Sequence, residues 1–195
     1  SSLLQDDVRW SEHDEREFFL TIDEETDRLN RLVGNLLDMS RLQTGVLQMV
    51  TRAVGWEEVV AAAAASIGIA PLEQLVVDVP ETLPPIAADP ELLERSVANV
   101  VANALRHGAG APVELRAWAG EGVVELAIVD HGPGVPADQH ERLFEPFQRL
   151  GDTGGTGVGL GLAVAYGFVT AMHGSIETGE TPGGGLTVRI SLPVA

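Results

Sequence analysis

The chain has 195 residues, of which 45% are hydrophobic, which is enough for one domain of ordinary size and an additional segment. Its formal net charge of −17 argues against nucleic acid or an anionic membrane surface as a binding partner, because both would repel it. No apolar run approaches the roughly 20 residues of a membrane span, and no basic signal-peptide region precedes an apolar stretch.

A long amphipathic helix is predicted over residues 12–42. Ser11 is a suitable N-cap, and acidic residues occupy the first turn, where the helix dipole favours them. Apolar residues recur at heptad spacing at Ile22, Leu29 and Leu36. This pattern favours a dimerising helical hairpin over the alternative, an ordinary amphipathic helix packed on its own domain.

Short apolar runs and helix signals divide the rest of the chain into further elements. The pattern predicts strands at residues 46–50, 54–56, 74–79, 112–118, 122–130, 174–178 and 186–192. It predicts helices at residues 57–66, 90–107, 137–144 and 163–173. Prolines between residues 80 and 85 indicate an extended connection, after which Asp89 and Pro90 provide an N-cap and a first-turn proline.

The helix predicted at residues 90–107 carries a polar stripe. At about 100° per residue, Asn99, Asn103 and Arg106 fall on the side opposite the apolar face. Asn is a poor helix former, and a solvated face would rather carry Glu or Lys. Together with His107, the stripe indicates a surface that holds a metal–phosphate group, and from this helix alone a merely solvated face is an equal alternative.

Two glycine clusters follow the strand predicted at residues 122–130. Asp130 ends that strand and precedes Gly132 and Gly134, and the second cluster, residues 157–161, opens a predicted helix. Glycine lets backbone approach a ligand closely, and free N–H groups at a helix start favour phosphate. The clusters predict a nucleotide site, although their spacing fits neither a dinucleotide-binding G-x-G-x-x-G motif nor a P-loop. A glycine-rich surface loop is the alternative for either cluster alone.

Four sequence boxes, in this order, resemble those of the ATP-binding domain of sensor histidine kinases, whose Bergerat fold is shared with gyrase and MutL. They are an asparagine box, a first glycine box, a phenylalanine box and a second glycine box, at residues 99–107, 130–134, 144–147 and 157–162. One box alone would be weak evidence, but four in register are highly specific. The resemblance implies an α+β fold over residues 46–195, an α/β sandwich with a mixed sheet and helices on one face.

Residues 1–45 resemble the second helix of the dimerisation and phosphotransfer hairpin of these kinases, and residues 35–45 are similar to the KdpD type, the potassium-responsive sensors. The phosphoacceptor box, H-[DE]-x-R-T-P-L, is absent. His13-Asp14-Glu15-Arg16 imitates its start, but Glu17-Phe18-Phe19 follows. We therefore expect the acceptor-histidine helix to lie upstream, in the cytoplasmic portion of a membrane-bound sensor kinase.

By this resemblance, residues from all four boxes form the ATP site. Asp130 would accept a hydrogen bond from the adenine amino group, Asn103 would bind Mg²⁺, and Arg149 would reach the γ-phosphate from a mobile lid at residues 148–156. The residues implied to bind ATP are Asn99, Asn103, Arg106, His107, Asp130, Gly132, Gly134, Val135, Phe147, Arg149, Gly157, Gly159, Leu160 and Gly161. A third glycine box before Thr187 is degenerate, because Leu186 stands where the family often has Thr or Ser.

The resemblance implies a protein-histidine kinase that forms a homodimer through its helical hairpin. It would transfer the ATP γ-phosphoryl group to a histidine that this chain lacks, and then to an aspartate of a response regulator. An ATP hydrolase of the same fold is one alternative, but such enzymes carry a general-base Glu where this chain has Asn99. A non-catalytic module that binds ATP or only holds a dimer together is the second alternative.

Overall fold

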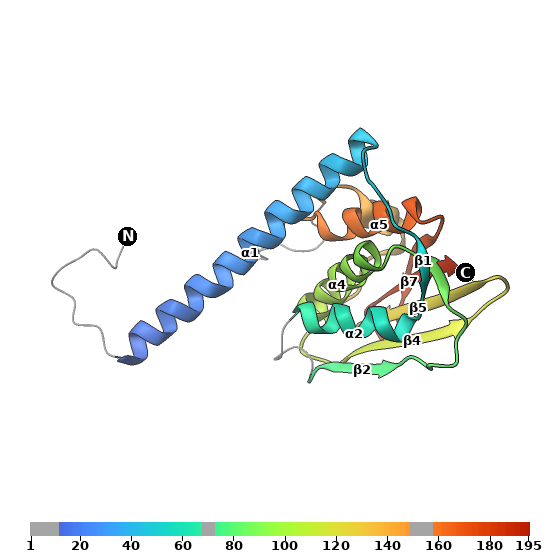
Figure 1. Cartoon of the computed structure of the whole chain (residues 1–195). Helices are drawn as coiled ribbons and strands as arrows, with labels where there is room; N and C mark the ends of the chain where they lie inside the picture. Colours follow the sequence, from blue (N-terminus) through green and yellow to red (C-terminus); the bar gives the residue numbers. More distant parts are fainter. Residues whose placement is uncertain (1–11, 68–72, 149–157) are drawn as a thin grey trace.

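The computed structural model describes residues 12–67, 73–148 and 158–195. In these ranges, a long helix is followed by a sandwich with one layer of helices and one layer of strands (Figure 1). This arrangement confirms the predicted α+β fold, with a mixed sheet and helices on one of its faces.

The main sheet has five strands in the order β2-β4-β5-β7-β6. Strand β2 runs parallel to β4, and all other neighbouring strands are antiparallel. Their bounds are β2 Leu75–Asp78, β4 Val113–Ala119, β5 Val123–Val129, β6 Ser175–Glu180 and β7 Leu186–Pro193. A separate antiparallel pair joins β1 (Arg52–Val54) to β3 (Ile86–Ala88).

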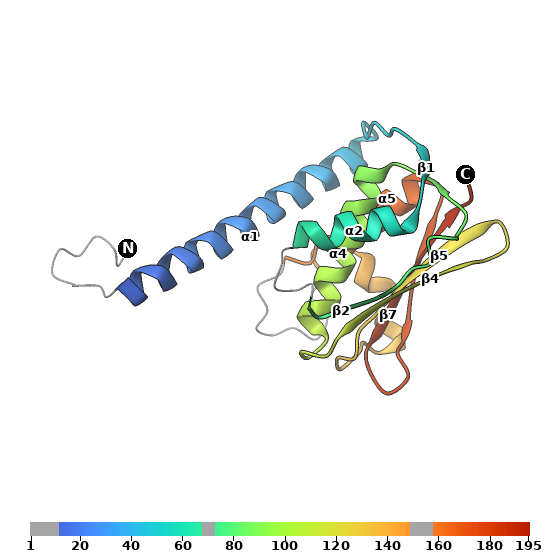
Figure 2. The ribbon, with the colours of Figure 1, turned by 60° about the horizontal axis from the view of Figure 1, so that its bottom comes forward.

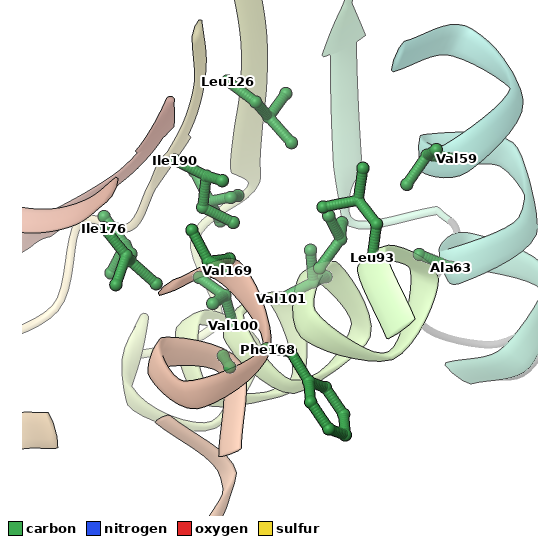
Figure 3. Close-up of a cluster of buried hydrophobic side chains, with 14 of the residues drawn as sticks. Val59, Ala63, Leu93, Val100, Val101, Leu126, Phe168, Val169, Ile176 and Ile190 are labelled. Atoms are coloured by element: carbon green, nitrogen blue, oxygen red, sulfur yellow. The ribbon is translucent and has the colours of Figure 1, made fainter. Parts of the chain in front are cut away.

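Three helices, α2 (Trp56–Ile67), α4 (Pro90–His107) and α5 (Gly161–Ala171), lie on one side of the main sheet (Figure 2). Figure 3 shows side chains from both layers meeting in the core, with Leu126 and Ile190 from the sheet and Val101 and Val169 from the helices. All four side chains are at most 1% exposed. Burying this apolar surface on a single side of the sheet is the main stabilising contribution to the sandwich.

Asp89 organises the start of α4, as its position before Pro90 predicts. Its Oδ1 accepts hydrogen bonds from the backbone N–H groups of Glu91 (3.1 Å) and Leu92 (3.2 Å). Its Oδ2 accepts one from the N–H of Val50 (2.7 Å), in the connection that follows the first helix. One buried carboxylate therefore caps the helix and ties the incoming chain to it.

Several predicted elements differ from the structure. Residues 46–50 form no strand, because this segment lies outside both sheets and Val50 donates to Asp89 instead. The strand predicted at residues 54–56 ends at Val54, since helix α2 already begins at Trp56, and β3 lies where only an extended connection was expected.

The helix predicted at residues 137–144 consists of two 3₁₀ turns, η2 (Ala137–Gln139) and η3 (Glu141–Phe144). Their N–H groups bond to carbonyls three residues back, as in the bond from Leu143 to His140. Helix α5 begins two residues earlier than predicted and ends two residues earlier, at Ala171.

Helix α1 (Glu12–Thr44) projects away from the sandwich over much of its length (Figures 1 and 2). The predicted heptad residues Ile22, Leu29 and Leu36 are 48%, 57% and 50% exposed, so no described residue covers this seam. Contacts with described residues of the sandwich come from the C-terminal part of the helix. No helix in the described ranges is long and apolar enough to cross a membrane.

An ion pair holds the C-terminal part of α1 against α4. The Asp38 side chain is buried, and both of its carboxylate oxygens accept hydrogen bonds from the Arg95 guanidinium. The same guanidinium lies 5.6 Å from the ring centroid of Phe168 on α5. One turn further along α1, Leu42 occupies the space beside Gly167, where any larger residue would meet it. The ion pair thus joins α1 to α4, and the contact between Leu42 and Gly167 joins α1 to α5.

We expect Asp89→Ala to lower the free energy of unfolding by about 1–2 kcal/mol, because N-cap losses fall in that range. Asp89→Asn keeps an acceptor for the α4 cap and should cost less. Urea denaturation of both variants provides the measurement, and equal stability of Asp89→Ala and the wild type would contradict the assigned cap.

We expect Asp38→Ala to release the C-terminal part of α1 from the sandwich, because a charge-assisted hydrogen bond contributes about 1.5–3 kcal/mol. Amide hydrogen exchange over residues 34–44 should accelerate roughly tenfold or more, while exchange in β5 and β7 stays unchanged. Arg41→Ala, which removes an exposed charge on the same helix, is the matched control. Unchanged exchange in Asp38→Ala would show that the ion pair does not hold the helix.

Candidate functional site

Asp130 follows directly after β5 and is 3% exposed. Its Oδ1 accepts hydrogen bonds from the N–H groups of Gly132 (2.9 Å) and Leu186 (3.2 Å). Its own N–H donates to the carbonyl of Leu186 (3.0 Å), which extends the β5–β7 pairing by one residue. The carboxylate is therefore held at the end of the central strands by two separate segments.

The glycines of the first box lie against backbone of the same protein. A Cβ on Gly132 would overlap with the carbonyl oxygen of His107, the last residue of α4. Gly134 has φ +71°, and a Cβ there would lie 2.9 Å from the carbonyl oxygen of Gly185. From the sequence, we expected these glycines to let backbone approach a ligand closely. In the structure, the space that a side chain would take at both glycines is occupied by backbone atoms of the protein itself.

The polar stripe of α4 faces the start of α5. Asn99 and Asn103 are partly buried, while Arg106 is exposed near the helix end. A Cβ on Gly161, the first residue of α5, would lie 3.5 Å from Oδ1 of Asn99. The structure thus brings the asparagine box next to the second glycine box.

Among the described residues, no side-chain hydrogen bond caps the N-terminus of α5. Leu160 occupies the N-cap position and is 3% exposed, so its side chain contributes an apolar wall but no acceptor. The first N–H groups of a helix lack partners within the helix and together with the helix dipole favour an anion. The start of α5 therefore offers donors suited to a phosphate group.

The phenylalanine box is joined to the second glycine box through backbone. The N–H of Phe147 donates to the carbonyl of Gly159 (2.9 Å), and both residues have positive φ, +66° and +74°. A Cβ on Gly159 would overlap with the carbonyl of Gln148, so glycine is required there. The Phe147 side chain is 62% exposed, and the structure places it at the surface.

Val135 and Phe144 lie in the segment between the first glycine box and the phenylalanine box, and both make contacts that hold this segment in place. The Phe144 ring packs on Tyr166 of α5, with ring centroids 5.2 Å apart. Val135 is partly buried, and its carbonyl lies 2.9 Å from Nε2 of His140. These contacts fix the segment that connects the first glycine box to the phenylalanine box.

His131, inside the first glycine box, pairs with Glu114 on β4, with Nε2 and Oε1 3.0 Å apart. The hydrogen bond from His131, assisted by Arg116, lowers the pKa of Glu114 below its usual value. The contact lies at the rim, because His131 is exposed, and it ties the loop to a neighbouring strand.

Not every predicted residue can be placed. Arg149, Gly157 and the predicted lid at residues 148–156, apart from Gln148, lie outside the described residues. Within the described ranges, no group of three or more acidic or histidine side chains is arranged to hold a metal ion. The amide oxygens of Asn99 and Asn103 are the polar groups that the α4 stripe offers to a cation.

The segment before β7 contributes to the site although Leu186 stands where the family often has Thr or Ser. The structure shows that the Leu186 backbone, not its side chain, contacts Asp130. Three consecutive glycines at residues 183–185, all with positive φ, were the signal available in the sequence.

Comparisons with known proteins agree with this geometry. Residues 88–195 match the family described as histidine kinase-, DNA gyrase B-, and HSP90-like ATPase. The chain is 45% identical over 200 residues to the sensor protein KdpD of Mycobacterium tuberculosis (strain ATCC 25618 / H37Rv), covering 98% of this chain and 23% of that protein. It is 45% identical over 168 residues to the sensor protein KdpD of Rathayibacter rathayi, covering 86% of this chain and 20% of that protein. The chain thus spans less than a quarter of the length of these relatives.

Solved structures show the same likeness. Full-length ShkA in complex with AMPPNP superposes with a TM-score of 0.75 at 28% identity, covering 96% of this chain and 40% of that chain. The ATP binding domain of PrrB from Mycobacterium tuberculosis superposes with a TM-score of 0.58 at 29% identity, covering 74% of this chain and 98% of that chain. The chain therefore belongs to the histidine kinase-, DNA gyrase B- and HSP90-like ATPase family, and its relatives within that family are sensor histidine kinases.

Proposed function

We propose that this chain binds Mg·ATP and is the catalytic ATP-binding part of a two-component sensor histidine kinase. The observation that carries the proposal is that α4 contacts both the loop that anchors the Asp130 carboxylate and, through Asn99 of its polar stripe, the start of α5. In this proposal residues 46–195 form the ATP-binding domain, and residues 1–45 are the second helix of a dimerisation hairpin.

Asp130 recognises the adenine base. Two backbone N–H groups occupy its Oδ1, and an ionised carboxylate is a pure acceptor, so its other oxygen suits the exocyclic amino group of adenine. Val135 and Leu160 provide apolar surface on either side. Because base recognition rests on one buried acceptor, a base with a carbonyl at the same position is disfavoured.

The start of α5 holds the phosphates. Backbone N–H groups near Gly159 and Gly161 donate to phosphate oxygens, and the helix dipole adds a favourable field. A chain with a net charge of −17 needs such local donors, because its overall field repels ATP. In the same proposal, Gly157 adds a further amide and Arg149 reaches the γ-phosphate.

Asn103 and Asn99 fit a Mg²⁺ ion bound mainly through phosphate and water. Mg²⁺ prefers oxygen ligands and usually keeps several waters, so one or two amide oxygens suffice where acidic side chains do not gather. The ion supplies charge neutralisation on the phosphates. Arg106 and His107, at the end of the same stripe, flank the phosphate groups.

The proposed reaction is phosphoryl transfer to a histidine on another helix. The bond between the γ-phosphorus and its bridging oxygen to the β-phosphate breaks, a phosphorus–nitrogen bond forms, and ADP leaves. The domain contributes positioning and charge stabilisation rather than covalent chemistry. An aspartate of a response regulator then receives the phosphoryl group.

The residue at position 99 favours a kinase over a hydrolase. A carboxylate at that position could accept a proton from water, but the amide of Asn99 cannot. General-base catalysis contributes roughly 10²–10⁴-fold, so its absence makes water a poor acceptor. A histidine side chain is a nucleophile without such help when its nitrogen is unprotonated.

The exposed seam of α1 supports dimerisation of the whole protein. Ile22, Leu29, Val33 and Leu36 are all about half exposed, which is costly for a helix that stays alone in water. In the proposed homodimer this seam lies in a four-helix bundle. By likeness to its KdpD relatives, the whole protein is a sensor kinase of the KdpD type whose ATP-binding part is cytoplasmic.

We predict that the wild type binds Mg·ATP and prefers it to Mg·GTP, and that Asp130→Asn weakens ATP binding roughly ten- to a hundredfold. A hydrogen bond to a charged acceptor is worth about 1.5–3 kcal/mol, which corresponds to that range. Asp78→Asn, at the exposed end of β2, removes the same charge away from the site and is the control for isothermal titration calorimetry. Equal affinity of the wild type for ATP and GTP would contradict adenine recognition.

We predict that the chain alone binds ATP, yet neither labels itself with γ-³²P nor hydrolyses ATP appreciably. Of its histidines, His107 and His131 belong to the site, and His140 is engaged with Val135. Adding the upstream helix of a KdpD relative should yield phosphorylation that is labile to acid and stable to base. Rapid hydrolysis by the chain alone would favour the hydrolase alternative, and binding without transfer to any acceptor helix would favour a non-catalytic module.

A further inference from the structure

The turn between β6 and β7 packs tightly against the loop that carries Asp130. Gly185 is buried with φ +117°, and a Cβ there would overlap with the carbonyl oxygen of Asp130 and lie 2.9 Å from the Cα of His131. On the far side of the loop, Gly134 leaves no room for a side chain beside Gly185. The turn therefore contacts the Asp130 loop through backbone at two places.

The turn is itself closed by hydrogen bonds between its own residues. The N–H of Thr181 donates to the carbonyl of Gly185 (3.2 Å), and the N–H of Gly184 donates to the carbonyl of Thr181 (2.9 Å). The hydroxyl groups of Thr181 and Thr187 lie 2.9 Å apart across its base, and Thr181 is 5% exposed. A turn held in this way presents the N–H of the next residue in a fixed direction.

That N–H belongs to Leu186 and donates to Oδ1 of Asp130. Gly132 supplies the second donor to the same oxygen, from within the loop. If the carboxylate rotated away, both N–H groups would lose their acceptor. Within the described part of the chain, the hydrogen bonds to the Asp130 carboxylate end on Oδ1 and leave Oδ2 available. The backbone thus distinguishes two oxygens that are chemically equivalent in a free carboxylate.

We propose that the turn at residues 181–185 and the N–H of Leu186 determine base specificity, by fixing the direction in which the remaining oxygen of the Asp130 carboxylate faces the base. This inference rests on the proposed function, in which Asp130 reads adenine. With Oδ1 occupied, Oδ2 is an acceptor of fixed direction. It pairs with the amino group at position 6 of adenine and opposes the carbonyl at that position in hypoxanthine or guanine. Leu186 acts through its backbone N–H, so the hydrogen bond to Asp130 does not require Thr or Ser at this position.

The first test compares ATP with inosine triphosphate, whose base differs from adenine along the edge at positions 1 and 6 and lacks the 2-amino group of guanine. The wild type should bind ATP on the order of ten- to a hundredfold more tightly. Gly185→Ala displaces Asp130 and should bring this ratio towards one. Gly122→Ala is the matched control, because Gly122 also has positive φ (+73°) with no atom within 4 Å of a Cβ, but lies in the β4–β5 hairpin, outside the turn. Its ratio should equal that of the wild type.

A second variant tests the inference even if Gly185→Ala does not fold. In Asp130→Asn the amide oxygen must take the place of Oδ1, because two N–H groups point at it. The amide NH₂ group then faces the base as a donor, which suits a carbonyl at position 6. The ATP to inosine triphosphate ratio should therefore fall below one, an inversion that a purely structural role of the turn would not produce.

The outcomes separate the inference from the proposed function. A wild type that binds neither nucleotide contradicts the proposed function and this inference with it. A wild type that prefers ATP, combined with a folded Gly185→Ala that keeps the full ratio, overturns the inference alone. An Asp130→Asn variant that binds both nucleotides more weakly by the same factor also overturns the inference alone. That result would show that the two N–H groups do not fix the orientation of the amide. Fluorescence competition gives the ratios, and circular dichroism establishes folding.

Discussion

Close backbone packing among three glycine positions is the constraint on which the candidate site depends. Gly132 lies against the end of α4, Gly134 lies against Gly185, and Gly185 lies against Asp130. Each contact excludes a Cβ, so the end of α4, the loop after β5 and the turn before β7 pack closely together, and N–H groups of the loop and of Leu186 reach the Asp130 carboxylate. The site is therefore built from main chain first, and the side chain of Asp130 is oriented by it.

Helix α4 connects this site to the core. Its apolar face is buried against the sheet, its N-terminus is capped by Asp89, and its last carbonyl contacts Gly132. Because the apolar face leaves the helix little freedom to rotate, Asn99 is presented towards the start of α5. Core packing thus positions polar groups that contribute little to stability themselves.

The contact between α1 and the sandwich links the catalytic part to the helix that leads away from it. Asp38 is buried and pairs with Arg95, whose pKa is lowered by desolvation, and the same guanidinium stacks on Phe168. A paired charge that is partly removed from water is stable only in one geometry. In the proposed kinase, this joint sets where the ATP site stands relative to the dimerisation helices.

The sequence by itself determined the element types and the identity of the four boxes. Periodicity identified α1, α4 and most strands, and Asp89-Pro90 marked a helix start, while the glycine clusters led to the prediction of a nucleotide site. Residues 46–50 were mistaken for a strand, because alternation cannot show whether a pairing partner exists. Only the tertiary structure decided that Gly132 and Gly134 pack on protein backbone and that Leu186 holds Asp130. A glycine can mark a close approach of backbone, but its residue type does not say which segment or ligand approaches, so the partner becomes visible only when distant segments are brought together.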